Sequence, residues 1–488
     1  MRYRTAAAML LATLLVGAGG VALAQPLAAG AQTSAAQPVA ETDASALGRR
    51  ILKAAAEGDA AFLAFIHEAD PKSRRPDAEW LELRQRILRT LQLHRLEQAS
   101  ATHAEFSVFD PSVDAWARLT VDITESKPHT LTGFSVLIGR PPSDIPPTPK
   151  FAAAAIAAAT REHVAALVRD DRFSGAVLIA RNGKTLLAEA YGLADREART
   201  PNTVDTQFRF GSMGKMLTAV SIMQLAQAGK LDLTAAIGHY LKDYPNADIA
   251  SKVTIDNLLT HSGGTGDIFT PEYFAKRLEV RDTKDYVALF GARAPQFAPG
   301  DRAEYSNYGF MLLGRIVEVV SGQSYDDYIA SHIFAPAHMT ATGNKPETVR
   351  LPRRATGYLI RGGQLVSAAD TLPWRGTPAG GGYSTVGDLA RFADALMANR
   401  LLDAAHTKLL TTGGITAPNG QFLRYDFGAA ASDGRRFFGH GGGAPGMNGD
   451  LRIFPAEPGH DAYTVVVLAN RDPPVAGVIA NFISDRLP

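Results

Sequence analysis

The stretch "RFGSMGKML", residues 209–217, decides how this chain is interpreted, because it places Ser212 three residues before Lys215. A phosphate-binding loop would need a glycine five residues before the Gly-Lys pair and Ser or Thr after it, and this stretch has arginine and methionine there. A G-x-S-x-G nucleophile elbow would need a glycine where Phe210 stands. The remaining interpretation is S-x-x-K, in which a serine has a lysine one helical turn away.

The residues after this lysine, 216–228, are apolar on nearly all sides and predict a buried helix that ends at Gly229. A lysine amine in a dry site beside a helix N-terminus can lose its proton near neutral pH, and Lys215 could then be the base that a serine nucleophile needs. The same helix start puts the Ser212 N–H where an oxyanion would form. By itself, the tetrapeptide also fits a capping serine followed by a lysine that reaches to solvent.

Four further motifs give the tetrapeptide its context. They are LLTHSGG at 258–264, FAPGDRAEYSNYGFMLLG at 297–314, AGGGYSTVGDLARFADAL at 379–396 and FGHGGGAPGMNGDLRIFP at 438–455. In this order the motifs resemble the serine β-lactamase/penicillin-binding-protein superfamily, specifically its class C-like branch of β-lactamases, esterases, D-aminopeptidases and D-alanyl-D-alanine carboxypeptidases. The resemblance runs from residue 151 to the end of the chain. It implies a mixed α/β fold of the β-lactamase/transpeptidase type, with an antiparallel sheet flanked by helices and a helical lobe.

The resemblance also implies roles for individual residues. Ser212 would be the acylated nucleophile and Lys215 its general base. Tyr305, in Tyr-Ser-Asn, would pass a proton to the leaving group and activate the deacylating water, and Asn307 would orient the substrate amide and contact Lys215. A phenol suits this role if a neighbouring ammonium lowers its pKa of about 10.

The strand motif departs from the Lys-Thr-Gly of many relatives, because this chain has His440, Gly441 and Gly442 there. The glycines would let a substrate backbone lie close to the strand, and the Gly443 N–H would be the second oxyanion donor beside that of Ser212. An unperturbed histidine is mostly neutral at pH 7, whereas a lysine suits a substrate carboxylate. His-x-Gly resembles the esterase and D-aminopeptidase members, which argues against β-lactamase activity.

Three other features carry less weight. Gly214 stands where the superfamily commonly has Thr or Ser, and closer packing around the nucleophile is the only reason that the sequence suggests. Gly441, Gly443 and Gly446 satisfy G-x-G-x-x-G, but the alternating strand pattern after them argues against a dinucleotide site. His261 has no partner at metal-ligand spacing and is interpreted as a structural loop residue.

The chain also divides into segments by composition. A proline-rich linker at 140–150 separates a small α+β domain at 46–139 from the hydrolase domain at 151–488. In the small domain, a helix is predicted over 47–69 and a half-buried strand over 115–123. Two helices followed by at least three strands resemble nuclear-transport-factor-2-like or cystatin-like modules.

The N-terminus predicts export. Residues 1–24 have the basic, apolar and small-residue regions of a secretory signal peptide, and residues 25–45 are expected to be a disordered lead-in. The apolar stretch is too short for a comfortable membrane span, so stable membrane insertion is not expected. With a net charge of +1 and no cysteine, the chain is not expected to bind nucleic acid or form disulfides. A periplasmic or secreted bacterial protein fits these features.

Together these features predict an exported serine hydrolase that acts on small acyl esters or on D-amino-acid amides and peptides. A β-lactamase or D-Ala-D-Ala carboxypeptidase is the alternative within the superfamily. A cell-wall peptide-binding module with little turnover is the alternative of another class. The predicted partners are small-molecule or peptide substrates, cell-wall peptides among them, with the oligomeric state left open. This chemistry requires no metal and no organic cofactor.

Overall fold

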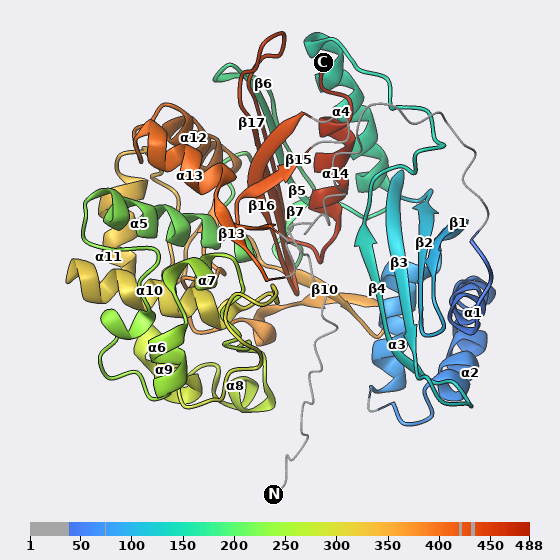
Figure 1. The fold of residues 1–488 in the computed structure, drawn as a ribbon. Helices are drawn as coiled ribbons and strands as arrows, with labels where there is room; N and C mark the ends of the chain where they lie inside the picture. Colours follow the sequence, from blue (N-terminus) through green and yellow to red (C-terminus); the bar gives the residue numbers. More distant parts are fainter. Residues whose placement is uncertain (1–38, 74, 419–421, 431–434) are drawn as a thin grey trace, which may run out of the picture. The chain divides into compact units, whose positions relative to one another are not determined.

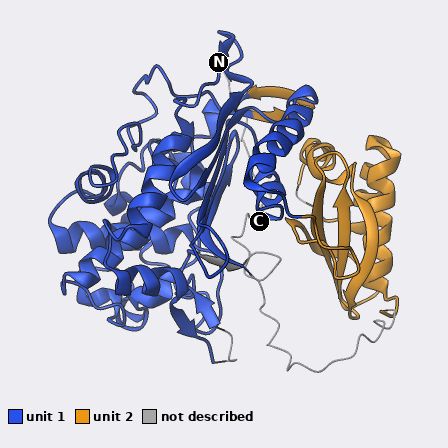
Figure 2. Cartoon of the chain, turned by 90° about the horizontal axis from the view of Figure 1, so that it is seen from above, with its two compact units in different colours: residues 1–11, 150–358, 367–488 blue, residues 12–149, 359–366 orange. Residues whose placement is uncertain are grey.

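A computed structural model describes residues 39–73, 75–418, 422–430 and 435–488. The chain forms two compact units, shown in different colours in Figure 2. The larger unit contains Lys150–Tyr358 and Ser367–Pro488, and the smaller unit ends at Pro149 but also includes Leu359–Val366. The predicted signal peptide lies outside the described residues, as does most of the predicted lead-in.

The larger unit is built around a six-stranded antiparallel sheet (Figure 1). In spatial order its strands are β15 (Gly428–Ala430), β16 (Arg436–Ala444), β17 (Met447–Phe454), β18 (Tyr463–Ala469), β5 (Gly175–Arg181) and β6 (Lys184–Tyr191). The turn Asn182-Gly183 joins β5 to β6, and this pair of residues is the strongest short hairpin signal in the sequence. The predicted fold class is therefore confirmed.

Helices cover both faces of this sheet. Helices α4 (Ala153–Arg169) and α14 (Val475–Ser484) lie on one face, and α12 (Val386–Met397) packs on β18 and β5 from the other (Figure 1). Strand β18 is buried along its whole length, which explains why it is mostly apolar, with Thr464 the polar exception, instead of alternating.

The helical lobe is inserted between β6 and β15. Its other helices are α5 (Lys215–Gln227), α6 (Ala247–Lys252), α7 (Ile255–Leu259), α8 (Pro271–Lys276), α9 (Thr283–Phe290), α10 (Asn307–Ser321), α11 (Tyr325–Ile329) and α13 (Ala404–Thr412). The short strands in this part of the chain are β7 (Leu193–Asp195), β8 (Thr200–Pro201), β9 (Phe208–Arg209), β12 (Tyr383–Ser384), β13 (Gly414–Thr416) and β14 (Phe422–Arg424), together with β10 (Tyr358–Arg361) and β11 (Gln364–Ser367), whose hairpin is counted with the smaller unit. Helix α5 packs against α10 and is buried on nearly all sides, so its first residue lies in the protein interior.

The smaller unit has three helices followed by a four-stranded antiparallel sheet in the order β1-β2-β3-β4. These elements are α1 (Asp43–Glu57), α2 (Asp59–Ala69), α3 (Asp77–Leu83), β1 (Gln92–Ala99), β2 (His103–Asp110), β3 (Ala115–Ile123) and β4 (Leu131–Ile138). Helix α1 packs on one face of the sheet, where Ile51, Phe106 and Val121 are fully buried.

Three details of this unit differ from the sequence prediction. The helix predicted over 47–69 is two helices, because Gly58 adopts φ 130° between them. Helix α1 begins at Asp43, inside the predicted lead-in, and a capping box between Thr42 and Ser45 fixes that start. The hairpin residues 359–366 belong to this unit although they lie far along the chain.

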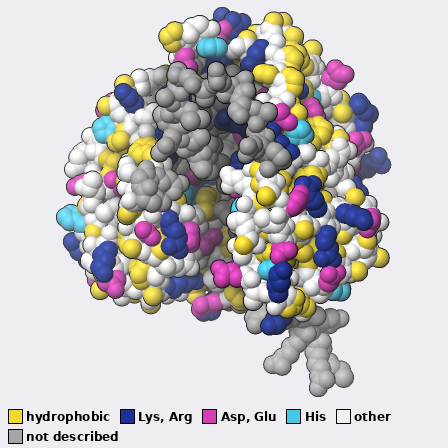
Figure 3. Space-filling model, turned by 45° about the vertical axis from the view of Figure 1, so that its right-hand side comes forward, with side chains coloured by type: hydrophobic (Ala, Val, Ile, Leu, Met, Phe, Trp, Pro, Cys, Tyr) yellow, Lys and Arg dark blue, Asp and Glu magenta, His cyan; other side chains and the backbone are white. Residues whose placement is uncertain are grey.

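Charged side chains of both signs are interspersed on the face shown in Figure 3, as a net charge of +1 leads one to expect. Within the described part of the chain, no helix is both long enough and apolar enough to cross a membrane.

Candidate active site

The nucleophile candidate Ser212 lies in a single 3-10 turn, Gly211–Gly214, which leads directly into α5. Lys215 is the first residue of α5 and is completely buried, whereas Ser212 is half-buried. The two side chains point toward each other, with Lys215 Nζ 3.2 Å from Ser212 Oγ. The structure therefore brings the S-x-x-K pair within reach of proton transfer.

Two fixed acceptors flank the lysine amine. Lys215 Nζ donates to Asn307 Oδ1 and to the carbonyl oxygen of Ala379, both at 2.7 Å. A neutral amine has two N–H donors, so these acceptors leave its lone pair to face the serine hydroxyl. Burial lowers the pKa of Lys215 from 10.5 to about 8, against the opposing charges of Asp426 and Asp267. A substantial neutral fraction is therefore present near neutral pH.

Asp267 fixes the orientation of Asn307, the first residue of α10. The Asn307 backbone N–H donates to Asp267 Oδ1 at 2.9 Å, and Asn307 Nδ2 donates to Asp267 Oδ2 at 3.2 Å. Because the amide nitrogen faces the carboxylate, the amide oxygen faces Lys215. Sequence reasoning missed Asp267, since nothing in the loop after LLTHSGG marks this carboxylate among the other acids of the lobe.

Tyr305 stands over the lysine, with Nζ 4.6 Å from its ring centroid. Its hydroxyl is buried and interacts with Ser212 without a hydrogen bond of standard geometry to any described residue. The sequence-based expectation for its pKa was wrong. Burial raises the pKa of Tyr305 well above 10, and Asp426 adds to this effect, so the phenol keeps its proton.

Strand β16 borders the nucleophile turn. Gly442 is buried, and a Cβ placed there would lie 1.9 Å from the Phe210 carbonyl oxygen, so this glycine serves close packing on the nucleophile segment. Gly441 and Gly443 are half-buried and share the opposite face of the strand. The Gly443 nitrogen lies beside Gly211, where a Cβ would come within 2.9 Å of it. This placement suits the oxyanion role implied for Gly443.

His440 is a buried, paired residue. Its Nε2 lies 2.8 Å from Asp426 Oδ2, and its Nδ1 contacts the Gly441 carbonyl oxygen. Its side chain has no exposed surface, so any influence on substrate passes through β16 or through Asp426. The carboxylate partner of His440, Asp426, lies 14 residues earlier in the chain and was not predicted from the sequence.

A second histidine joins the same carboxylate. His261 Nε2 lies 3.4 Å from Asp426 Oδ1, and His261 Nδ1 accepts a hydrogen bond from the Ser306 backbone N–H at 3.1 Å. The ring packs on Tyr305 with centroids 4.5 Å apart. His261, interpreted from the sequence as a structural loop residue, therefore lies beside Tyr305 at the site. Burial would raise the pKa of Asp426, yet His440 and His261 outweigh this effect and hold it below its usual range.

The glycine-rich segment 379–382 packs backbone against backbone on the nucleophile turn. The Gly381 N–H donates to the Gly211 carbonyl at 3.1 Å, and the Phe210 N–H donates to the Gly382 carbonyl at 3.1 Å. This contact explains Gly214, because a Cβ there would lie 3.0 Å from the Gly380 Cα. The segment also holds the Ala379 carbonyl against Lys215.

We expect Gly380→Ala to disable the site. Gly380 has φ 137°, and a Cβ there would lie 2.3 Å from the Gly211 carbonyl oxygen, so both strain and overlap displace the nucleophile turn. We expect a stability loss of about 2–4 kcal/mol and at least a tenfold lower kcat, measured by thermal unfolding and ester hydrolysis. Gly322→Ala is the matched control, because Gly322 has φ 73° with nothing within 4 Å and should lose stability but not activity. An unchanged kcat for Gly380→Ala would contradict this packing argument.

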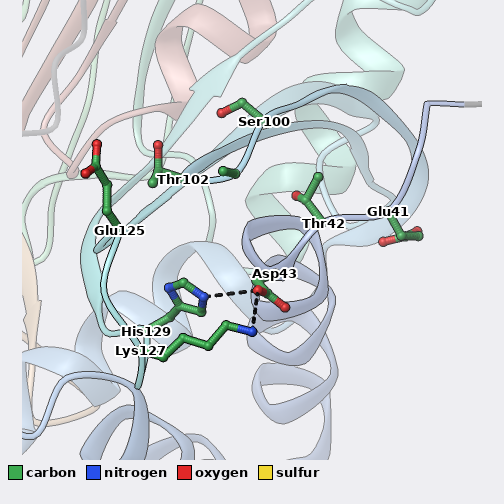
Figure 4. Close-up of a pocket in the computed structure, with 9 residues that line it drawn as sticks. Glu41, Thr42, Asp43, Ser100, Thr102, Glu125, Lys127 and His129 are labelled. Carbon is green, nitrogen blue, oxygen red and sulfur yellow. Dashed lines mark hydrogen bonds and ion pairs between the residues drawn. The ribbon is translucent and has the colours of Figure 1, made fainter.

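A separate hollow of about 990 Å³ lies in the smaller unit (Figure 4). Asp43 bonds there to His129 at 3.0 Å and to Lys127 at 3.4 Å. The charges of these three groups are paired with one another, and the three include no nucleophile paired with a base. Among the residues that the structure describes, no group of three or more His, Asp or Glu is arranged to hold a metal.

Comparisons with known proteins point to the larger unit. The family described as Beta-lactamase matches residues 158–487. Penicillin-binding protein 4 of Amycolatopsis lactamdurans is 30% identical over 346 residues, 67% of this chain and 87% of that protein. PbpX of Bacillus subtilis is 32% identical over 250 residues, 49% of this chain but only 59% of its own length. A penicillin-binding protein structure from Bacillus halodurans superposes with TM-score 0.59 and 29% identity, covering 66% of this chain and 98% of that chain.

Proposed function

Because this chain belongs to the Beta-lactamase family of serine hydrolases, we propose that it hydrolyses esters or amides through an acyl-enzyme on Ser212. One observation carries the proposal. Lys215 is buried with two of its donor directions taken by Asn307 and Ala379 and the third facing Ser212 Oγ. In the neutral form of Lys215 this third direction holds the lone pair, which can accept the Ser212 proton.

The acylation step follows from these contacts. Neutral Lys215 takes the proton of Ser212 as Oγ attacks the substrate carbonyl carbon. The oxyanion is stabilised by the backbone N–H groups of Ser212 and Gly443. Tyr305 gives its proton to the leaving oxygen or nitrogen as the acyl bond breaks, and the phenolate recovers a proton from the Lys215 ammonium.

In deacylation, water takes the place of the serine as nucleophile, and Ser212 Oγ becomes the leaving group. Neutral Lys215 accepts a proton from water, and the hydroxide attacks the acyl carbonyl. The tetrahedral intermediate then collapses, and Ser212 Oγ leaves with the proton that Lys215 had taken. Because the pKa of Tyr305 is raised, its phenol acts as a proton donor and relay here, and Lys215 is the base.

Covalent labelling tests the proposal. Intact-protein mass is measured after exposure to a fluorophosphonate and to a β-lactam, for wild type and Ser212→Ala. We expect one fluorophosphonate adduct on wild type and none on Ser212→Ala. If wild type forms no adduct, or if Ser212→Ala forms an equal one, the chain is better described as a cell-wall peptide-binding module.

For substrate class, we propose small acyl esters or D-amino-acid amides and peptides. His440 occupies the strand position that holds lysine in many relatives. Its side chain is buried and contacts Asp426, so it does not present an exposed cation to a substrate carboxylate. We expect turnover of esters and D-amides above that of a chromogenic cephalosporin or a peptide ending in D-Ala-D-Ala. The reverse order would favour the β-lactamase or carboxypeptidase alternative.

Activity should rise with pH through the pKa of Lys215, about 8. Only the neutral amine accepts the serine proton, so kcat/KM should fall about tenfold per pH unit on the acid side. The measurement is kcat/KM for an ester between pH 5 and 10, corrected for spontaneous hydrolysis. A profile that is flat from pH 6 to 9 would show that Lys215 is not the base.

We also propose that the protein is exported. The support is the basic and apolar pattern of residues 1–24 with its small-residue cleavage pattern. Mass spectrometry of the protein from a periplasmic fraction should give a chain that begins near Gln25. Recovery of a chain that retains Met1 in the cytoplasm alone would contradict export.

A further inference from the structure

Asp426 connects two parts of the site that come from distant segments. It follows strand β14 and is nearly fully buried. One carboxylate oxygen lies 2.8 Å from His440 Nε2 on β16, and the other lies 3.4 Å from His261 Nε2 in the loop after α7. A single carboxylate is therefore hydrogen-bonded to one histidine from the sheet and lies within ion-pair distance of one from the helical lobe, whose Nε2 has no hydrogen bond of standard geometry to any described residue.

The two histidines are connected to the catalytic set in different ways. The His261 ring packs on Tyr305 at an interplanar angle of 30°, and its Nδ1 holds the backbone of Ser306, the residue between Tyr305 and Asn307. His440 lies on the strand that supplies Gly443, three residues further on. A shift of Asp426 would therefore move the Tyr305 ring and the second oxyanion donor together.

The same carboxylate places a charge near the base. Asp426 and Asp267 both act on Lys215 and oppose the effect of burial on its pKa, and both raise the pKa of Tyr305. The titratable groups that face this cluster are Lys215 from α5, Tyr305 before α10, His261 and Asp267 from the intervening loop, and His440 from β16. Burying an unpaired carboxylate costs free energy because the charge loses its hydration. His440 and His261 offset this cost for Asp426.

We propose that Asp426 is a positioning residue that holds the His261 and His440 rings and keeps a negative charge behind Lys215 and Tyr305. This proposal rests on the proposed hydrolase function for its kinetic consequences, but the geometry stands without it. Asp426 does not touch the reacting atoms, so its effect on catalysis passes through the two rings and through the field at Lys215.

The first test is Asp426→Asn, which keeps the side-chain shape and removes the charge. We expect kcat to fall at least tenfold with a smaller change in KM, because Tyr305 and the oxyanion donor are misplaced more in the transition state than in the bound complex. The acid limb of the kcat/KM profile should also move to lower pH by about one unit, because the charge that favours the Lys215 ammonium is gone. Asp426→Glu restores the charge and should return the acid limb toward wild type.

A matched control separates this role from ordinary burial. Asp388 in α12 is also a fully buried carboxylate, bonded to the Ala341 N–H at 2.8 Å, and it lies outside the cluster described above. Asp388→Asn should lower the melting temperature but leave the acid limb in place. If Asp426→Asn loses activity but its acid limb stays where it is in wild type and in Asp388→Asn, Asp426 is only structural and the proposal is overturned.

A second readout does not need turnover. Lysine labelled with 13C at Cε is followed by NMR as a function of pH, and the Lys215 signal is identified by its loss in Lys215→Met. We expect its midpoint to be lower in Asp426→Asn than in wild type, and an unchanged midpoint overturns the proposal. If the midpoint moves but wild type forms no adduct with a fluorophosphonate, Asp426 has the proposed role and the hydrolase function is the one that fails.

Discussion

Replacing Lys215 by methionine is expected to reduce kcat/KM for ester hydrolysis by about 10²–10⁴-fold, the range in which a positioned general base contributes. Methionine fills a similar volume in the buried position but has no lone pair to accept the Ser212 proton. Asn307 Oδ1 and the Ala379 carbonyl lose their donor at the same time, so the orientation of Asn307 depends on Asp267 alone.

The measurement for this variant is the rate of fluorophosphonate labelling together with steady-state ester hydrolysis. Lys230→Met is the control, because Lys230 is exposed just beyond the other end of α5. Thermal unfolding of both variants shows whether the fold is intact. A labelling rate for Lys215→Met within threefold of wild type would mean that another group activates Ser212.

The second large effect is expected for Tyr305→Phe. This change removes the hydroxyl but keeps the ring that packs on His261 and lies over Lys215. Because we propose that Tyr305 supplies the leaving-group proton, we expect the loss to depend on the leaving group. We expect a fall in kcat of about 10²–10³-fold for amides and alkyl esters and a much smaller fall for a nitrophenyl ester, whose leaving group needs no proton.

The matched control is Tyr308→Phe, three residues further along. Tyr308 is fully buried in α10, and its hydroxyl lies 3.1 Å from that of Tyr244, so its loss should affect stability alone. A plot of log kcat against leaving-group pKa should be steeper for Tyr305→Phe than for wild type or Tyr308→Phe. Equal slopes for all three proteins would assign the leaving-group proton to another residue.

Much of the fold could be predicted from local patterns. The Asn182-Gly183 turn, the alternation in β3 and the mostly apolar β18 each depend on neighbours within a few residues, and the structure contains these elements. The break at Gly58 and the start of α1 were missed, because a glycine inside an apolar pattern does not show by itself whether the helix continues.

In the candidate site, too, some pairings follow from sequence spacing and others only from the tertiary structure. Ser212 and Lys215 are close because they are three residues apart at the start of one helix, so their pairing follows from sequence spacing. Asp267 and Asp426 have no such spacing to the residues that they bind. They reach Asn307, His261 and His440 only because the lobe and the sheet fold together, and one sequence without spatial information contains no sign of those pairings.

The sequence by itself therefore determined the spacing of the candidate nucleophile and base and the order of the motifs, since these are set by helical periodicity and by residue type. Only the tertiary structure decided the electrostatics. Burial of α5 lowers the pKa of Lys215, burial of Tyr305 raises its pKa, and Asp426 engages His440 in the interior. Gly214 follows the same rule, because the Gly380 backbone that leaves little room for a larger side chain there comes from a segment 166 residues further along the chain. Desolvation and packing depend on every element around a group, whereas spacing depends on the chain alone.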